Sequence, residues 1–137
     1  MSGTAHPVRA LQEVLRNHLL AQPAIAAILG QAIYENPPRG AKPPFIAFGD
    51  ATVRDAGSTE SEAAVIEFDL LAHAAERRMH SALDMAVEVA AALQLPMAPP
   101  VGYHLVSIEI RQGVVRHDPA RNLTRASLRL RAFLEPL

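Results

Sequence analysis

Residues 63–73 read AAVIEFDLLAH, and their alternation of apolar and acidic side chains decides the expected fold class. Ile66 and Phe68 fall on one face of an extended chain. Glu67 and Asp69 fall on the opposite face. A period of two residues is typical of a strand that buries one face and leaves the other in water. We therefore expect this segment to lie in a sheet with one covered face.

The last third of the sequence contains two more runs with the same period. Val106, Ile108 and Ile110 alternate with polar residues, and residues 126–132, ASLRLRA, alternate in the same way. Between these runs lies RHDPARN, residues 116–122, which holds residue types that favour turns. The pattern predicts two antiparallel strands joined as a long hairpin.

Two strands are also expected upstream of residues 63–73. Residues 45–54, FIAFGDATVR, are rich in aromatic and β-branched types and should pair with residues 63–73, with a mobile turn at 55–62 between them. A brief strand, AIYE, is expected at residues 32–35. The four prolines of residues 36–44, NPPRGAKPP, remove backbone donors and predict a loop.

Helical periods occupy the remaining segments. Pro7 suits the first turn of a helix in which apolar residues recur at spacings of three and four: Val8, Leu11, Leu15 and Leu19. A second short helix should begin at Pro23 and end at Gly30. The main helix is expected from Ala75 to Leu95, before Pro96, with these residues on its buried face: Met79, Leu83, Ala86, Ala90 and Leu93.

The order of elements is therefore α, α, β, β, β, α, β, β. It excludes a purely parallel doubly wound sheet and predicts an α+β fold. We expect a mainly antiparallel sheet of about four to five strands, with the long helix and the N-terminal helix packed on one face. The 137 residues are close to the usual size of one domain, so we expect a single domain over residues 1–137.

Composition excludes several classes of function. The net charge of −1 gives no general attraction to nucleic acid or to an anionic membrane. The sequence has no cysteine, so it forms neither disulfides nor thiolate sites, and this fits a reducing cytoplasm. The first ten residues do not resemble a signal peptide, and no apolar stretch is long enough to span a bilayer, so we expect no membrane partner.

No motif for catalysis or cofactor binding is present. The six histidines show no metal-ligand spacing such as HExxH, and His73 and His80 flank a predicted junction between strand and helix. His80 and Asp84 are four residues apart, but they belong to a polar row typical of a solvated helix face. GxSxG, GxGxxG and the P-loop pattern are also missing. We expect no catalytic residue, cofactor or metal, and therefore no enzyme.

The sharpest local feature is a set of arginines on one face of the predicted last strand: Arg125, Arg129 and Arg131. One interpretation is a basic stripe that touches DNA phosphates passing through a ring of subunits. The other is pairing across strands or subunits with carboxylates on neighbouring polar faces: Glu67, Asp69 and Glu109. We favour the second interpretation.

Taken in order, five segments carry a resemblance across nearly the whole chain: ALQEVLRNHLLAQPAIAAILG, AIYENPP, PPFIAFGDATVRDAG, VIEFDLLAHA and LVSIEIRQGVVRHDPARNLTRASLRLRAFLE. They resemble the tail-completion (tail-terminator) proteins of long-tailed phages and of gene transfer agents. The chain departs from the family pattern at residues 71–73, LAH, where we would expect a tryptophan. This departure affects packing more than role.

The resemblance implies a structural virion protein without catalysis. It implies a homo-hexameric ring at the head-proximal end of the tail tube, which stops polymerisation of the tube protein and joins the tube to a head-tail connector or stopper. DNA would pass through the ring without sequence recognition. Assembly in the bacterial cytoplasm would precede residence at the head-tail junction. Two alternatives stay open: another connector component, such as a stopper, and a small oligomeric binding module unrelated to tails.

Two exposed loops are candidates for contact with the tube or connector. They cover residues 40–44 and 55–62, because loops that order on assembly can bind at modest affinity. The polar residues expected to make such contacts, in and beside these loops, are Arg39, Lys42, Asp55, Ser58 and Glu60.

Overall fold

The computed structural model describes residues 6–55, 63–75 and 79–137. Its elements follow the predicted order. They are α1 (Pro7–Leu20), α2 (Pro23–Leu29), β1 (Ile33–Tyr34), β2 (Phe45–Asp55), β3 (Ala64–Ala75), α3 (Met79–Leu93), β4 (Tyr103–Asp118) and β5 (Leu123–Pro136). The expected α+β class is confirmed.

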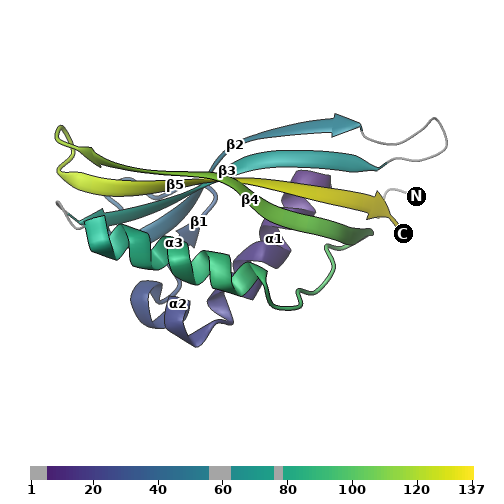
Figure 1. The fold of residues 1–137 in the computed structure, drawn as a ribbon, viewed down its shortest axis with the longest axis horizontal. Helices are drawn as coiled ribbons and strands as arrows, with labels where there is room; N and C mark the ends of the chain where they lie inside the picture. The colour runs from purple at the N-terminus through teal and green to yellow at the C-terminus, as the bar shows by residue number, and fades with distance from the viewer. Residues whose placement is uncertain (1–5, 56–62, 76–78) are drawn as a thin grey trace.

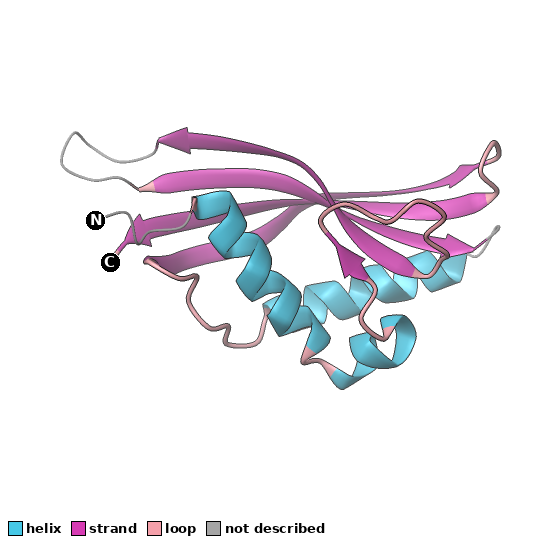
Figure 2. Ribbon diagram, turned by 180° about the vertical axis from the view of Figure 1, so that it is seen from behind, coloured by secondary structure: helices cyan, strands magenta, loops and turns pink. Residues whose placement is uncertain are grey.

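The strands form one five-stranded sheet in the order β1-β2-β3-β5-β4. The short β1 pairs with β2 in parallel, and all other neighbours are antiparallel. All three helices lie on one face of this sheet, which Figure 1 shows edge-on with the helices below it. No helix of the described residues covers the opposite face, which we call the open face; Figure 2 shows the same arrangement from behind.

Helices α1 and α2 begin and end where local chemistry requires. Pro7 occupies the first turn of α1, and the Nδ1 atom of His6 accepts a hydrogen bond from the backbone N–H of Val8 at 3.2 Å. Pro23 likewise occupies the first turn of α2. Gly30 follows the last turn of α2 with a φ of 61°, a value that glycine adopts without steric cost.

The core lies between the helices and the covered face of the sheet. β3 and β5 pair antiparallel without a register shift. Phe68 lies opposite Leu130, and both side chains are buried. The buried face of α1 contributes Leu11, Leu15 and Leu19, as predicted. Among the described residues, no helix has the length and apolar character needed to cross a membrane.

Helix α3 packs through a face that matches the predicted one only in part, since Ala86 and Leu93 are partly buried against the core as expected. Its buried residues are Ala82, Met85, Val89 and Ala92. Leu83, expected in the core, is exposed, and so is Val87, whose side chain is 61% exposed. The prediction was wrong because α3 is apolar on nearly every side, so its periodicity could not select the face that meets the sheet. Ala75, the expected first residue of this helix, is instead the last residue of β3, and residues 76–78 lie outside the described residues.

Strand β4 also departs from strict alternation. The pairing of β4 with β5 shifts register between Leu105 and Ser107 and again between Ile110 and Gln112. The first shift leaves Val106 exposed while Ile108 packs partly buried against the core, although the predicted alternation puts both on one face. An extra residue in one strand moves the following side chains to the other face, which a sequence period does not reveal.

Candidate functional site

The open face of the sheet carries the charged residues that the sequence singled out. Strand register brings Glu67 of β3 opposite Arg131 of β5, and Asp69 opposite Arg129. The Nη1 atom of Arg129 donates a hydrogen bond to the Oδ1 atom of Asp69 at 3.3 Å. Both side chains are about one-third exposed. This cross-strand ion pair lies at the centre of the sheet and is accessible to water.

Arg131 has acidic neighbours on both sides. Glu67 faces it from β3 and Glu109 faces it from β4. Both carboxylates bind other arginines, since Glu67 pairs with Arg54 at 3.5 Å and Glu109 pairs with Arg111 at 3.2 Å. Arg131 therefore lies in a field of compensating negative charge, although it makes no ion pair within 4 Å among the described residues.

Arg125 lies in a different environment from the other two arginines. It is opposite His73 of β3 on one side and opposite Arg116 of β4 on the other. Arg121 lies in the turn that follows Asp118. The structure thus divides the predicted stripe: Arg129 and Arg131 are balanced by carboxylates, whereas Arg125 lies among positive charges.

His73 lies opposite Arg125 at this end of the sheet. Its ring stacks on Phe45, with centroids 4.4 Å apart and an interplanar angle of 19°, and its side chain is buried. Its Nδ1 atom has no hydrogen-bond partner among the described residues. Burial, together with smaller effects of the charges of Arg125 and Arg121, lowers the pKa of His73 from 6.5 to about 4. His73 is therefore neutral at physiological pH.

The loop residues named from the sequence are separated in the structure. Arg39 and Lys42 are exposed in the segment that leads into β2. Asp55 is the last residue of β2, at the opposite end of that strand. Ser58 and Glu60 lie outside the described residues. Among the described residues, the structure therefore does not bring Arg39 and Lys42 together with Asp55 as one surface.

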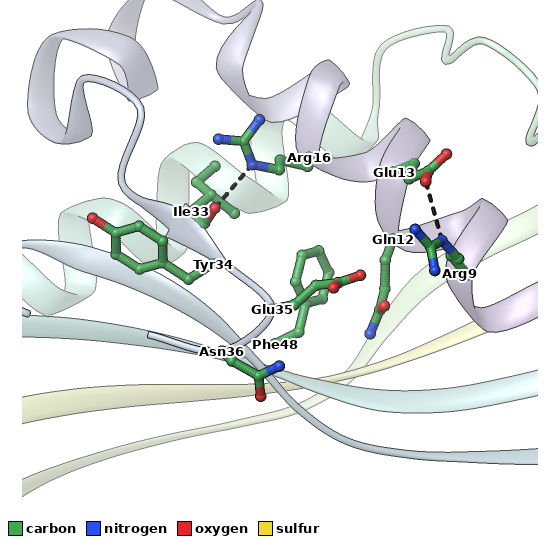
Figure 3. A pocket seen from close by; sticks show the side chains of 9 residues that line it. All are labelled: Arg9, Gln12, Glu13, Arg16, Ile33, Tyr34, Glu35, Asn36 and Phe48. Atoms are coloured by element: carbon green, nitrogen blue, oxygen red, sulfur yellow. Dashed lines mark hydrogen bonds and ion pairs between the residues drawn. The ribbon is translucent and has the colours of Figure 1, made fainter. Parts of the chain in front are cut away.

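A hollow that the sequence did not predict lies between α1 and β1. Its volume is about 510 Å³, and Figure 3 shows its lining side chains, which come from α1, β1, the two residues after β1, and β2. Arg9 pairs with Glu13 at 3.4 Å across one turn of α1. The Nε of Arg16 donates to the carbonyl oxygen of Ile33 at 2.9 Å, and an Nη2 donates to the carbonyl oxygen of Gln31 at 3.2 Å.

These contacts give the hollow a structural explanation. Arg16 satisfies carbonyl groups at β1, the strand on this edge of the sheet, and joins that strand to α1. The lining holds no arrangement of nucleophile and base. No group of three or more metal-ligating side chains occurs in the part of the chain that the structure describes. Sequence periodicity could assign Arg16 only to the polar face of α1, because its partners are 15 and 17 residues away.

Comparison with known proteins agrees with this fold. No curated protein matches the chain. A chain from the solved structure described as "Virion of native gene transfer agent (GTA) particle" has the same fold, with a TM-score of 0.81 and 24% sequence identity. The match covers 96% of this chain and 99% of that chain. The family model "Tail completion protein gp17" matches residues 13–135, and the chain therefore belongs to the tail completion protein gp17 family.

Proposed function

We propose that the protein is a tail terminator, which forms a homo-hexameric ring on the head-proximal end of a tail tube. In this role it stops polymerisation of the tube protein and joins the tube to a head-tail connector or stopper. The observation that carries the proposal is the family match over residues 13–135, which leaves little of the chain outside it. The function is structural and involves no catalysis.

A ring of identical subunits needs a heterologous interface whose rotation closes. Two features of the subunit support such an interface. The outward side of α3 and the residues after it expose large apolar side chains four or more positions apart: Leu83, Val87 and Leu95. Exposed apolar surface of this kind is typical of contact sites. β4 is the last strand in the sheet order, so its outer edge has no partner strand among the described residues.

The place of the protein in the particle follows from the same proposal. It assembles in the bacterial cytoplasm as a single tail-completion-like domain, residues 1–137, and then remains at the head-tail junction. The open face, with Glu67, Asp69, Arg129 and Arg131, either lines the ring or contacts a neighbouring subunit. Arg39, Lys42 and the segment that begins at Asp55 are candidates for contact with the tube and the connector.

Electron microscopy of particles from a strain without this gene tests the proposal. We expect overlong tails, because termination is lost, and tails that are not attached to heads. Complementation with the intact gene is the control and should restore both length and attachment. Tails of normal length beside unattached, filled heads would instead indicate a neighbouring connector component. Particles that are normal in both respects would refute a tail-completion role.

A further inference from the structure

The hairpin formed by β4 and β5 carries three exposed arginines near its turn, which we call the hairpin arginines: Arg116, Arg121 and Arg125. Arg116 and Arg125 are direct cross-strand partners in the register of the two strands. Like charges that face each other directly across strands destabilise a sheet. The fold therefore gains nothing from this arrangement, and an external anion would offset its cost.

Little negative charge within the subunit compensates these arginines. Asp118 is near Arg121, with 3.9 Å between a carboxylate oxygen and Nε. Its other oxygen already accepts hydrogen bonds from the backbone N–H groups of Ala120 and Arg121, which order the turn. Arg116 and Arg125 make no ion pair within 4 Å in the described part of the chain. Arg129, on the same strand as Arg125, differs directly because it binds Asp69 of β3.

We propose that the hairpin arginines bind the phosphate backbone of duplex DNA. Guanidinium groups present planar sets of donors that match phosphate oxygens. Lys42 and Arg39 precede β2 at the same end of the sheet, since Phe45, His73 and Arg125 follow one another across the strands. Both of these cations are exposed.

The surroundings favour DNA over an acidic protein as the occupant. Protein interfaces normally have an apolar core surrounded by polar residues. In the described part of the chain, Val106 and Leu137 are exposed, but no large apolar side chain between them in the sequence is exposed. The hairpin is therefore a charged surface without an apolar centre. Such a surface suits contacts to phosphates that are independent of base sequence.

His73 supports the geometric argument from a second direction. Burial is the main cause of the lowered pKa of His73, and the charges that add to this effect belong to arginines. The side chain remains neutral and does not reduce the positive field of Arg125. The pKa of His73 is lowered partly by Arg125 and Arg121, which is consistent with arginine charges that carboxylates leave largely unscreened.

Binding of the purified full-length protein to a fluorescent 30-base-pair duplex tests the inference, independently of ring formation. Anisotropy is followed from low to moderate NaCl for the wild type and for the double variant Arg116→Gln/Arg125→Gln. Removing two phosphate contacts should weaken binding at least tenfold at low salt. It should also lower the salt dependence, d log K/d log[NaCl], by about 1.8 in magnitude. The matched control is Arg54→Gln/Arg111→Gln, which removes the same charge from arginines that already bind carboxylates.

Stability separates a binding role from a structural one. Because Arg116 and Arg125 repel each other, the double variant should unfold at the same temperature as the wild type or at a higher one. Absence of wild-type binding at low salt would overturn the proposal, and so would an equal loss of binding in the control. Loss of binding together with a lower unfolding temperature would assign the arginines to the fold instead. Tighter binding of poly-L-glutamate than of DNA would identify an acidic protein as the occupant.

Discussion

Two valines on α3 give a sharp test of how this helix packs. Val89 is 1% exposed and lies against the core, whereas Val87, two residues earlier, is 61% exposed. The same substitution at both positions changes the same atoms in opposite environments. Val89→Ala removes two buried methyl groups, worth about 1.6 kcal/mol of transfer free energy. The remaining cavity adds to this cost, while the higher helix propensity of alanine offsets up to about 0.7 kcal/mol.

We therefore expect Val89→Ala to lower the free energy of unfolding by about 1.5 kcal/mol. For a chain of 137 residues this corresponds to a fall of about 5 °C in Tm. Val87→Ala should leave Tm unchanged or slightly raised. Thermal and urea unfolding of the two purified variants measure both quantities. Equal destabilisation by the two substitutions would refute the orientation of α3 described above.

Three further predictions concern charged and polar contacts. The pKa of His73 is lowered from 6.5 to about 4 in the folded protein, so the unfolded state binds more protons between these values and the free energy of unfolding falls as pH drops from 6.5 to 4. A His73→Phe variant should show a smaller fall in the free energy of unfolding, measured with urea, over that pH range. A pH profile identical to that of the wild type would contradict the shift. Arg129→Glu should destabilise the fold by about 1 kcal/mol through repulsion of Asp69. The exchanged pair Arg129→Glu/Asp69→Arg should recover most of this loss, and no recovery would exclude the pair as the cause. Arg16→Leu should cost about 1–2 kcal/mol, because the Ile33 carbonyl loses its donor. Thermal unfolding no different from that of the wild type would show that the contact contributes nothing.

The strands were predictable from the sequence because one face of the sheet is uncovered. In β5 and in the middle of β3, residues 66–72, every second residue is buried under the helices and the residues between are partly exposed, so burial and polarity alternate together. The turn between β4 and β5 was predictable for a local reason, since Asp118 and Asn122 provide turn chemistry within the segment itself. Patterns that depend only on near neighbours were therefore sufficient for the order and pairing of these elements.

The failures share a different cause. α3 consists largely of alanine and valine beyond Asp84, so several of its faces are apolar enough to be buried. Only contact with the sheet selects the face that contains Met85 and Val89. The bulge that exposes Val106 is likewise a property of the β4–β5 pairing and not of β4 alone. Bonds from Arg16 to β1 join residues far apart in the sequence and leave no local signal.

The arginine stripe shows how far a correct local prediction reaches. Alternation placed Arg125, Arg129 and Arg131 on one face, and the strand register confirms that they share it. Whether the charge of each arginine is available to a partner depends on the residues that lie opposite it on β3 and β4. The sequence does not specify this register. Asp69 binds Arg129, and Arg116 faces Arg125. Three arginines on one face of a single strand therefore differ in how their charges are compensated. Carboxylates of neighbouring strands lie opposite Arg129 and Arg131, whereas Arg125 at the hairpin is available to an anion outside the subunit.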